Sequence, residues 1–173
     1  LDGMAERTVT INSLSKTYSV TGWRVGWAIA GPDITSRIRK VHDFLTVGAP
    51  TPFQKAGVCA LKMPEAYYTS LHERYNTARN RICAVLKTVG FNVDVPKGAY
   101  YIMAHTGVLM DRYQDMGAKS FCLKLLDVTG IATVPGTAFY HSPVMGHDQV
   151  RFCFAKNEQT IEAVCRRLER LIA

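Results

Sequence analysis

Residues 13–26 read Ser-Leu-Ser-Lys-Thr-Tyr-Ser-Val-Thr-Gly-Trp-Arg-Val-Gly, and this segment determines how the rest of the chain is interpreted. Lys16 stands among small residues, and Arg24 follows shortly before Gly26. An arginine side chain offers a fixed fork of donors to phosphate oxygens, and the hydroxyls of Ser13 and Ser15 add further donors. The Lys16 amine is then left to condense with an aldehyde. The residue types predict a phosphate-binding turn with a reactive lysine.

Predicted strands lie on both sides of this segment. Residues 8–12 alternate and are rich in β-branched side chains, and residues 25–30 form a compact apolar run closed by Gly31 and Pro32. Two short buried strands cannot cover their own faces, so we expect them to belong to a larger sheet. Helices are predicted from Pro32 to the break at residues 48–52, and again over residues 53–63.

A long amphipathic helix is predicted from Pro64 to Val89, where apolar residues recur at three- and four-residue spacing and Gly90 supplies the end. Strands and short helices follow it. We expect strands at residues 91–95, 98–104, 131–134 and 149–155, a helix at residues 120–128, and a last helix capped by Asn157. The fold class is therefore α/β, with residues 1–63 as the truncated end of a large domain and residues 64–173 as a long linking helix and a small C-terminal α+β domain.

Composition sets limits on the function. The chain has 173 residues, of which 47% are hydrophobic and 20% charged, and no apolar run approaches the roughly 20 residues that cross a membrane. The formal charge of +7 is spread along the chain and its clusters fall on helix-like segments, so we expect solvated helix faces and no nucleic-acid partner. We expect no membrane partner either.

Cysteine and histidine positions do not indicate a metal site. The five cysteines are scattered without a Cys-x-x-Cys pair, which favours reduced thiols and a cytoplasmic protein. His105, His141 and His147 have neither metal-ligand spacing nor a visible catalytic partner, and we interpret them as loop or core residues.

The segment from Ser13 to Gly26 resembles the lysine signature of the fold-type I, class I and II, pyridoxal-phosphate-dependent aminotransferases. This resemblance implies that Lys16 forms the Schiff base with pyridoxal 5'-phosphate and moves the proton between the substrate Cα and the cofactor. It also implies that Arg24 grips the cofactor phosphate and that Ser13 is a second phosphate ligand. Ser15, whose hydroxyl is also available, completes the predicted cofactor-binding set. Residues 1–63 would then be the C-terminal portion of the cofactor-binding large domain.

Three later segments are similar to the same family in order and spacing. Residues 96–101 resemble its Pro-x-Gly-(Ala/Gly)-aromatic segment, residues 134–139 its Pro-Gly-x-x-Phe turn, and residues 150–155 a strand whose arginine pairs with the substrate α-carboxylate. The resemblance therefore implies that Arg151 binds substrate. The implied activity is transfer of an amino group between an amino acid and a 2-oxo acid.

The resemblance also implies partners that the chain does not contain. In the family an acidic residue under the pyridine nitrogen, and a tyrosine and an asparagine at the ring oxygen, come from upstream of the lysine. Only 15 residues precede Lys16 here. We expect the chain to be a fragment that is inactive alone, from a parent enzyme that is a homodimer.

Two other functions are compatible with these motifs. A pyridoxal-phosphate-dependent lyase, of the carbon–sulfur β-lyase type, would share the lysine signature and differ only in its product. An aminotransferase-like domain could also sense a ligand in a transcription regulator, in which case a basic DNA-binding segment would precede it.

Overall fold

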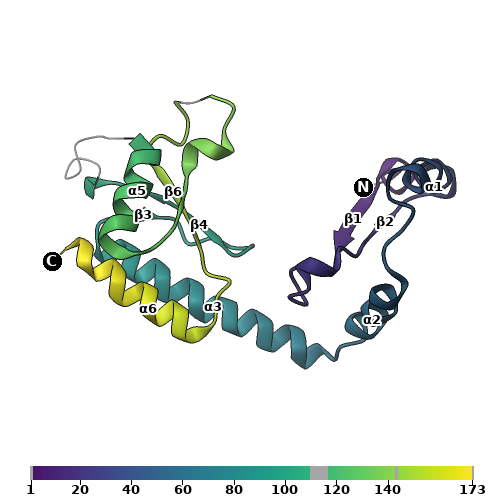
Figure 1. Ribbon diagram of the computed structural model, residues 1–173, viewed down its shortest axis with the longest axis horizontal. Coiled ribbons are helices and arrows are strands. Elements are labelled where there is room, and N and C mark those ends of the chain that lie inside the picture. The colour runs from purple at the N-terminus through teal and green to yellow at the C-terminus, as the bar shows by residue number, and fades with distance from the viewer. Residues whose placement is uncertain (1, 110–116, 143, 173) are drawn as a thin grey trace. The chain divides into compact units, whose positions relative to one another are not determined.

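A computed structural model describes residues 2–109, 117–142 and 144–172 of the chain. The chain divides into two compact units, Leu1–Tyr67 and Tyr68–Ala173, each with its own sheet (Figure 1). The division falls in the first turn of the long helix α3 (Glu65–Thr88). The assignment of residues 1–63 to a cofactor domain stays a prediction.

The first unit is built on a two-stranded antiparallel sheet. Strand β1 (Thr10–Ser13) pairs with β2 (Gly26–Ile29), from Thr10 opposite Ile29 to Ser13 opposite Gly26. Both predicted strands are present, although β1 begins and ends later than expected. Helices α1 (Pro32–Thr46) and α2 (Thr51–Leu61) follow, each with proline in its first turn, where a missing N–H costs nothing. Two short 3-10 turns, η1 (Ala5–Arg7) and η2 (Thr21–Trp23), complete the unit.

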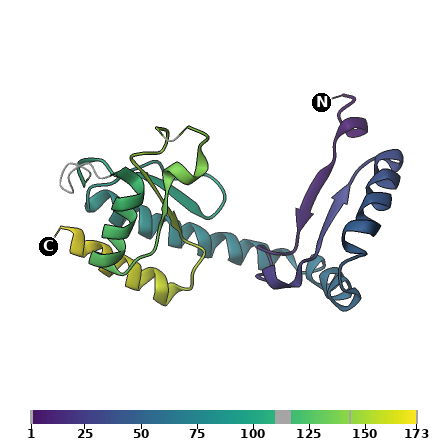
Figure 2. The same cartoon turned by 45° about the horizontal axis from the view of Figure 1, so that its top comes forward.

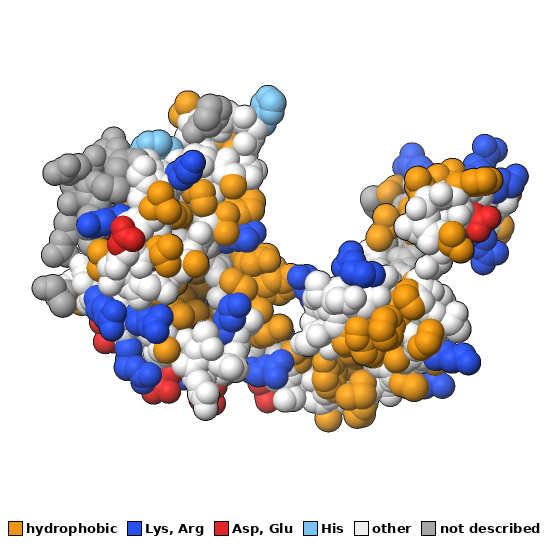
Figure 3. Space-filling view, in the orientation of Figure 1, with side chains coloured by type: hydrophobic (Ala, Val, Ile, Leu, Met, Phe, Trp, Pro, Cys, Tyr) orange, Lys and Arg blue, Asp and Glu red, His pale blue; other side chains and the backbone are white. Residues whose placement is uncertain are grey.

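This first unit buries little of its apolar surface. Among its described apolar side chains only Leu14 and Val25 are buried, and α1 buries no residue. Ile38, Val41 and Leu45 of α1 are exposed, and Phe44 near its end is 92% accessible. Figure 3 shows apolar side chains gathered on the surface of this unit. Such a surface is what a larger sheet and its covering layer would bury.

The second unit has a four-stranded antiparallel sheet in the order β3-β4-β6-β5. Figure 2 shows this unit in a second view, together with its helices. Strand β4 (Tyr101–His105) pairs along its length with β6 (Gln149–Cys153), while β3 (Asn92–Val93) and β5 (Val134–Pro135) are short edges. Alternate side chains of β4 and β6 are buried, as the period of a strand requires. They pack with α3, α5 (Gly117–Thr129) and α6 (Glu158–Leu168) in one core.

The end of α3 is a Schellman motif that leads the chain into this core. The Gly90 N–H donates to the Lys87 carbonyl at 3.2 Å, and the Phe91 N–H donates to the Leu86 carbonyl at 2.9 Å. Gly90 adopts a φ of 106°, which a side chain would disfavour. Phe91 then packs edge-on against Phe121 and Phe152. The turn at Gly90, which was predicted to end the helix, therefore also places Phe91 in the core.

The strand predicted at residues 131–134 was placed too early, because only Val134 of that range is in β5 (Val134–Pro135). The backbone N–H of Ile131 donates to the hydroxyl of Thr129 at 3.2 Å, and the Ile131 side chain enters the core. Pairing begins only at Val134, opposite Arg151, and lasts two residues before the 3-10 turn η3 (Gly136–Phe139). The predicted Asn157 cap is confirmed, since its side chain accepts from the Thr160 N–H at 2.8 Å. A last 3-10 turn, η4 (Glu169–Leu171), ends the described chain.

All five cysteines are free. Burial raises the pKa of the Cys83, Cys122 and Cys165 thiols, which lowers their reactivity, whereas Cys59 on α2 and Cys153 on β6 are exposed. Within the described ranges, no helix combines the length and the apolar character needed to cross a bilayer.

Two leucines of α5 test where the core lies. Leu125 is 2% exposed and Leu123, on the same helix, is 57% exposed. Leu125→Ala should lower the free energy of unfolding by roughly 2–5 kcal/mol because it leaves a cavity in the core. Leu123→Ala should change it by less than about 0.5 kcal/mol. Urea unfolding followed by circular dichroism measures both, and equal effects would contradict the assigned core.

Candidate functional site

Lys16 lies on a tight turn that closes on itself directly after β1. The N–H groups of Tyr18, Ser19 and Val20 donate to the carbonyls of Leu14, Lys16 and Ser15 at 3.2, 3.2 and 3.0 Å. The turn is anchored at its base, because Leu14 is buried and its N–H donates to the Val25 carbonyl at 3.1 Å. The Lys16 side chain is exposed. The sequence therefore places the exposed Lys16 side chain on a turn that is closed by local backbone hydrogen bonds.

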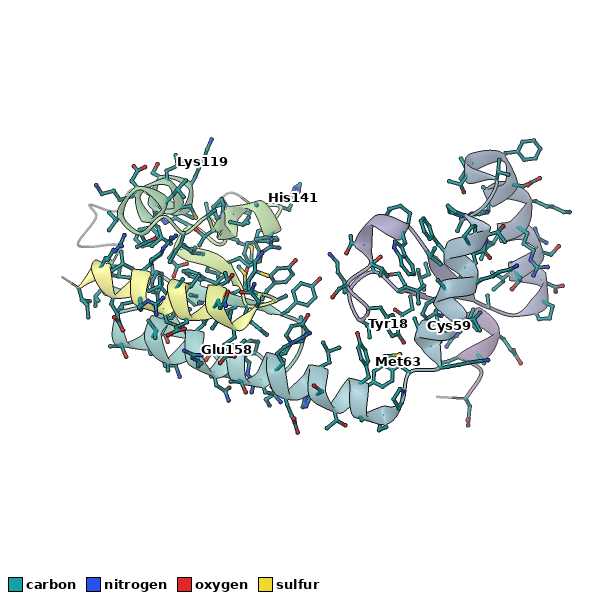
Figure 4. The ribbon with its side chains drawn as sticks, turned by 60° about the horizontal axis from the view of Figure 1, so that its bottom comes forward. Tyr18, Cys59, Met63, Lys119, His141 and Glu158 are labelled. Carbon is teal, nitrogen blue, oxygen red and sulfur yellow. The ribbon has the colours of Figure 1, made fainter. Side chains whose placement is uncertain are left out.

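Two side chains from outside the turn also stabilise its backbone through hydrogen bonds. The Tyr67 hydroxyl donates to the Thr17 carbonyl at 2.7 Å, and the Thr21 hydroxyl donates to the Ser15 carbonyl at 3.0 Å. Tyr67 also stacks on Tyr18, with ring centroids 5.8 Å apart. Tyr18 is labelled on the turn in Figure 4. The role of Tyr67 was not predicted from sequence, because fifty residues separate it from Thr17.

Arg24 has a strained backbone. Its φ of 56° and ψ of 41° lie in the left-handed region, which a residue other than glycine, asparagine or aspartate seldom adopts. Its neighbours hold this conformation, since Trp23 stacks on Phe53 at 5.1 Å and Val25 is buried. The exposed guanidinium donates one bond to the Thr21 carbonyl at 3.0 Å, so its other N–H groups remain available. Strain of this kind is often kept where it positions a functional side chain.

Ser13, Ser15 and Arg24 line one cavity of about 550 Å³. Trp27 and His42 are also in its wall. Hydroxyl and guanidinium donors suit the phosphate group of a cofactor, and the volume is in the range of small-molecule pockets. The Lys16 side chain does not line this cavity, although Lys16 directly follows Ser15. The donor set therefore fits a phosphate, and the predicted phosphate ligands are brought together.

Arg151 lies in the second unit, on β6, opposite Met103 of β4 and Val134 of β5. Its half-buried side chain is on the face of the sheet opposite to the core, because its neighbours Val150 and Phe152 are buried. The guanidinium carbon is 4.0 Å from the ring centre of Tyr101 and 4.6 Å from that of Phe139. Neither ring contact was predicted, although both residues belong to segments that the sequence singled out.

His105 lies at the end of β4 and has a partner that the sequence did not indicate. Its Nδ1 is 2.8 Å from a carboxylate oxygen of Asp148, and this hydrogen bond lowers the pKa of the Asp148 carboxyl. The Gln149 amide nitrogen is 3.3 Å from the other ring nitrogen, and the Tyr140 hydroxyl donates to the Gln149 side-chain oxygen at 2.9 Å. No cluster among the described histidines, cysteines and carboxylates could hold a metal ion.

Comparisons with known proteins agree with these motifs. The family profile of the class I and II aminotransferases matches residues 1–168. A probable N-succinyldiaminopimelate aminotransferase of Mycobacterium tuberculosis is 34% identical over 98% of this chain, and a kynurenine–oxoglutarate transaminase of Dictyostelium discoideum is 33% identical over 99%. The chain covers 44% and 43% of these two relatives, so it spans less than half of their length.

Solved structures have the same fold. The N-succinyldiaminopimelate aminotransferase of Mycobacterium tuberculosis superposes with a TM-score of 0.86 at 33% identity, over 99% of this chain and 44% of that one. An Escherichia coli protein with a methionine aminotransferase function superposes with a TM-score of 0.87 at 31% identity, over 98% of this chain and 43% of that one. The predicted α/β fold class is confirmed.

The hydroxyl of Tyr67 offers a test of how the lysine turn is held. Tyr67→Phe keeps the ring that stacks on Tyr18 and removes the bond to the Thr17 carbonyl. Loss of a bond worth about 1 kcal/mol should speed exchange of the Val20 amide hydrogen roughly fivefold. Hydrogen exchange followed by NMR measures this, with the amides of α5 as the internal control. An unchanged Val20 rate would show that the tyrosine does not stabilise the turn.

Proposed function

Because the chain belongs to the class I and II aminotransferases, we propose that it supplies the lysine and the small domain of a pyridoxal-phosphate-dependent transaminase. The observation that carries this proposal is the grouping of Ser13, Ser15 and Arg24 around one cavity, next to the turn of Lys16. The relatives named above are transaminases, which favours this outcome over a lyase or a regulator. The activity belongs to the whole protein, of which this chain is a part.

The family implies pyridoxal phosphate as the cofactor, and the first unit contains side chains suited to hold it. Arg24 would bind the phosphate through its unused N–H groups, and Ser13 and Ser15 would donate hydroxyl hydrogens to the same group. When bound, the cofactor supplies a conjugated ring that withdraws electrons from the Cα of an amino acid. The strained backbone of Arg24 supports this role, because it aims the guanidinium at the cost of a less favoured conformation.

Lys16 has two proposed tasks. Its amine would attach the cofactor through the aldehyde carbon, and after release it would carry the proton that leaves Cα of the substrate. Both tasks need a side chain that can move while its backbone stays in place. The closed turn of residues 14–20 would keep the backbone in place, and the Lys16 side chain is exposed and therefore able to move.

Arg151 would bind the α-carboxylate that amino-acid and 2-oxo-acid substrates share. A guanidinium can pair with a carboxylate through two parallel hydrogen bonds, which fixes the orientation of the substrate as well as its position. Its place on the open face of the sheet leaves it accessible for this pairing. The identity of the substrate side chain is not part of the proposal.

We further propose that the parent protein is a homodimer in a reducing, cytoplasmic compartment, acting on small molecules and not on nucleic acid. The exposed apolar side chains of the first unit support burial against further protein. The five free cysteines support a reducing compartment.

The assignment of Lys16 can be tested on this chain directly. The chain is mixed with pyridoxal phosphate, reduced with borohydride and mapped by peptide mass spectrometry. We expect an adduct at Lys16 that Lys16→Ala abolishes and that the control Lys62→Ala, at an exposed lysine of the same unit, leaves in place. Arg24→Lys should weaken loading about tenfold, because an ammonium group lacks the guanidinium fork. Equal labelling of all the lysines would contradict a preformed cofactor site at Lys16.

The same substitution in the whole protein tests the function. Lys16→Ala should abolish amino transfer from amino acids to 2-oxo acids, while Lys62→Ala should retain it. The 173-residue chain alone should show negligible turnover, since it covers less than half of its relatives. An active whole protein with Lys16→Ala would overturn the role of this lysine.

A further inference from the structure

The Arg151 guanidinium is held by two aromatic rings, and we infer that Tyr101 and Phe139 are positioning residues that prepare it to bind a carboxylate. This inference rests on the proposed function of Arg151. It adds a device that neither the motifs nor the relatives' names describe. We call the two rings the aromatic clamp.

The first ring comes from the neighbouring strand. Tyr101 lies on β4 opposite Cys153, and Arg151 is two residues before Cys153, so both side chains project from the same face of the sheet. The guanidinium carbon is 4.0 Å from the centre of the Tyr101 ring, well within the range of a cation–π contact. Tyr100 packs beside Tyr101, with ring centroids 4.6 Å apart, which limits movement of this first ring.

The second ring comes from the turn η3. Phe139 is 4.6 Å from the guanidinium carbon, and 46% of its surface is accessible. About half of the Phe139 side chain is therefore covered, and the guanidinium is one of its contacts. A contact over the ring face occupies the face of the guanidinium and leaves its N–H edge free. A carboxylate needs that edge for two parallel hydrogen bonds.

The turn that presents Phe139 is fixed by backbone packed against backbone. A Cβ at Gly136 would lie 2.6 Å from the Gly146 carbonyl oxygen, and a Cβ at Gly146 would lie 2.6 Å from the Gly136 carbonyl carbon. Only glycine at both positions permits this approach. The chain therefore closes a loop from residue 136 to residue 146, at the start of which η3 carries Phe139.

A chain of hydrogen bonds ties this loop to the sheet. Tyr140, which follows Phe139, donates to Gln149 at 2.9 Å, and Gln149 approaches His105 at 3.3 Å. His105 is in turn bonded to Asp148 at 2.8 Å. Gln149 and His105 face each other across β6 and β4, on the same open face as Arg151. Hydrogen bonds therefore connect the loop that carries Phe139 to strands β4 and β6, and β4 carries Tyr101.

The clamp can be tested apart from the catalytic activity. In the chain labelled with ¹⁵N-arginine, the Hε proton of Arg151, assigned with Arg151→Lys, should be shifted upfield by the two rings. Tyr101→Leu and Phe139→Leu should each move it back toward the position of a free arginine. Tyr101→Phe and Phe139→Tyr keep a ring and should retain the shift. Phe44→Leu removes an exposed aromatic residue elsewhere and should change nothing.

Titration of the whole protein with pyruvate, a 2-oxo acid with one carboxylate, tests the purpose of the clamp. Each leucine variant should bind pyruvate about two- to fivefold more weakly than the wild type, the range that corresponds to one cation–π contact at an accessible site. The variants that keep a ring should bind as the wild type does. Both clamp residues lie outside the core, and circular dichroism checks that the leucine variants fold.

Two different results would overturn the inference. If the leucine variants keep the upfield shift, or bind pyruvate as tightly as the wild type, the rings do not position Arg151. If pyruvate leaves the Arg151 signal of the wild type unchanged while the rings still shift it, Arg151 does not bind the carboxylate. The inference that the rings position Arg151 for a carboxylate is then wrong as well.

Discussion

The pairing of β4 with β6 is the constraint on which the second unit depends. Ile102 faces Phe152 and Ala104 faces Val150 across the pair, and all four are buried. Because side chains alternate along a strand, burying this set places Arg151 on the opposite face. A register shift of one residue would turn a guanidinium into the apolar core, where an unpaired charge is costly. The same burial that stabilises the unit therefore also exposes the residue proposed to bind substrate.

Features determined by neighbours in the chain could be predicted from the sequence. The long helix ends shortly before Gly90 as expected, because the Schellman bonds involve only the last turn. Asn157 caps α6 through a bond to a residue three positions away. The predicted phosphate ligands Ser13, Ser15 and Arg24 line one cavity, and their binding of a phosphate stays a prediction. They belong to one short segment, so the antiparallel turn between β1 and β2 brings them together.

Features that depend on distant pairing could not be predicted. Tyr67 supports the lysine turn from fifty residues away, and nothing in the periodicity of α3 indicates a bond to Thr17. His105 and Asp148 meet only because β4 and β6 are paired. The edge strand was misplaced for a different, local reason, since the hydroxyl of Thr129, two residues away, accepts the Ile131 N–H that a strand would have needed for pairing. For Tyr67 and Asp148 the partner was invisible in the local sequence.

The proposed cofactor chemistry lies in the unit that has little core of its own. Leu14 and Val25 are its buried apolar side chains among the described residues, so packing alone cannot make its lysine turn rigid. Hydrogen bonds hold the turn instead: three backbone bonds close it, and the Tyr67 and Thr21 hydroxyls donate to two of its carbonyls. A turn held in this way would keep its backbone conformation while the Lys16 side chain moves, which the two proposed tasks of Lys16 require. The strained backbone of Arg24 is also held by its surroundings, because the adjacent residues Trp23 and Val25 are fixed by stacking and by burial.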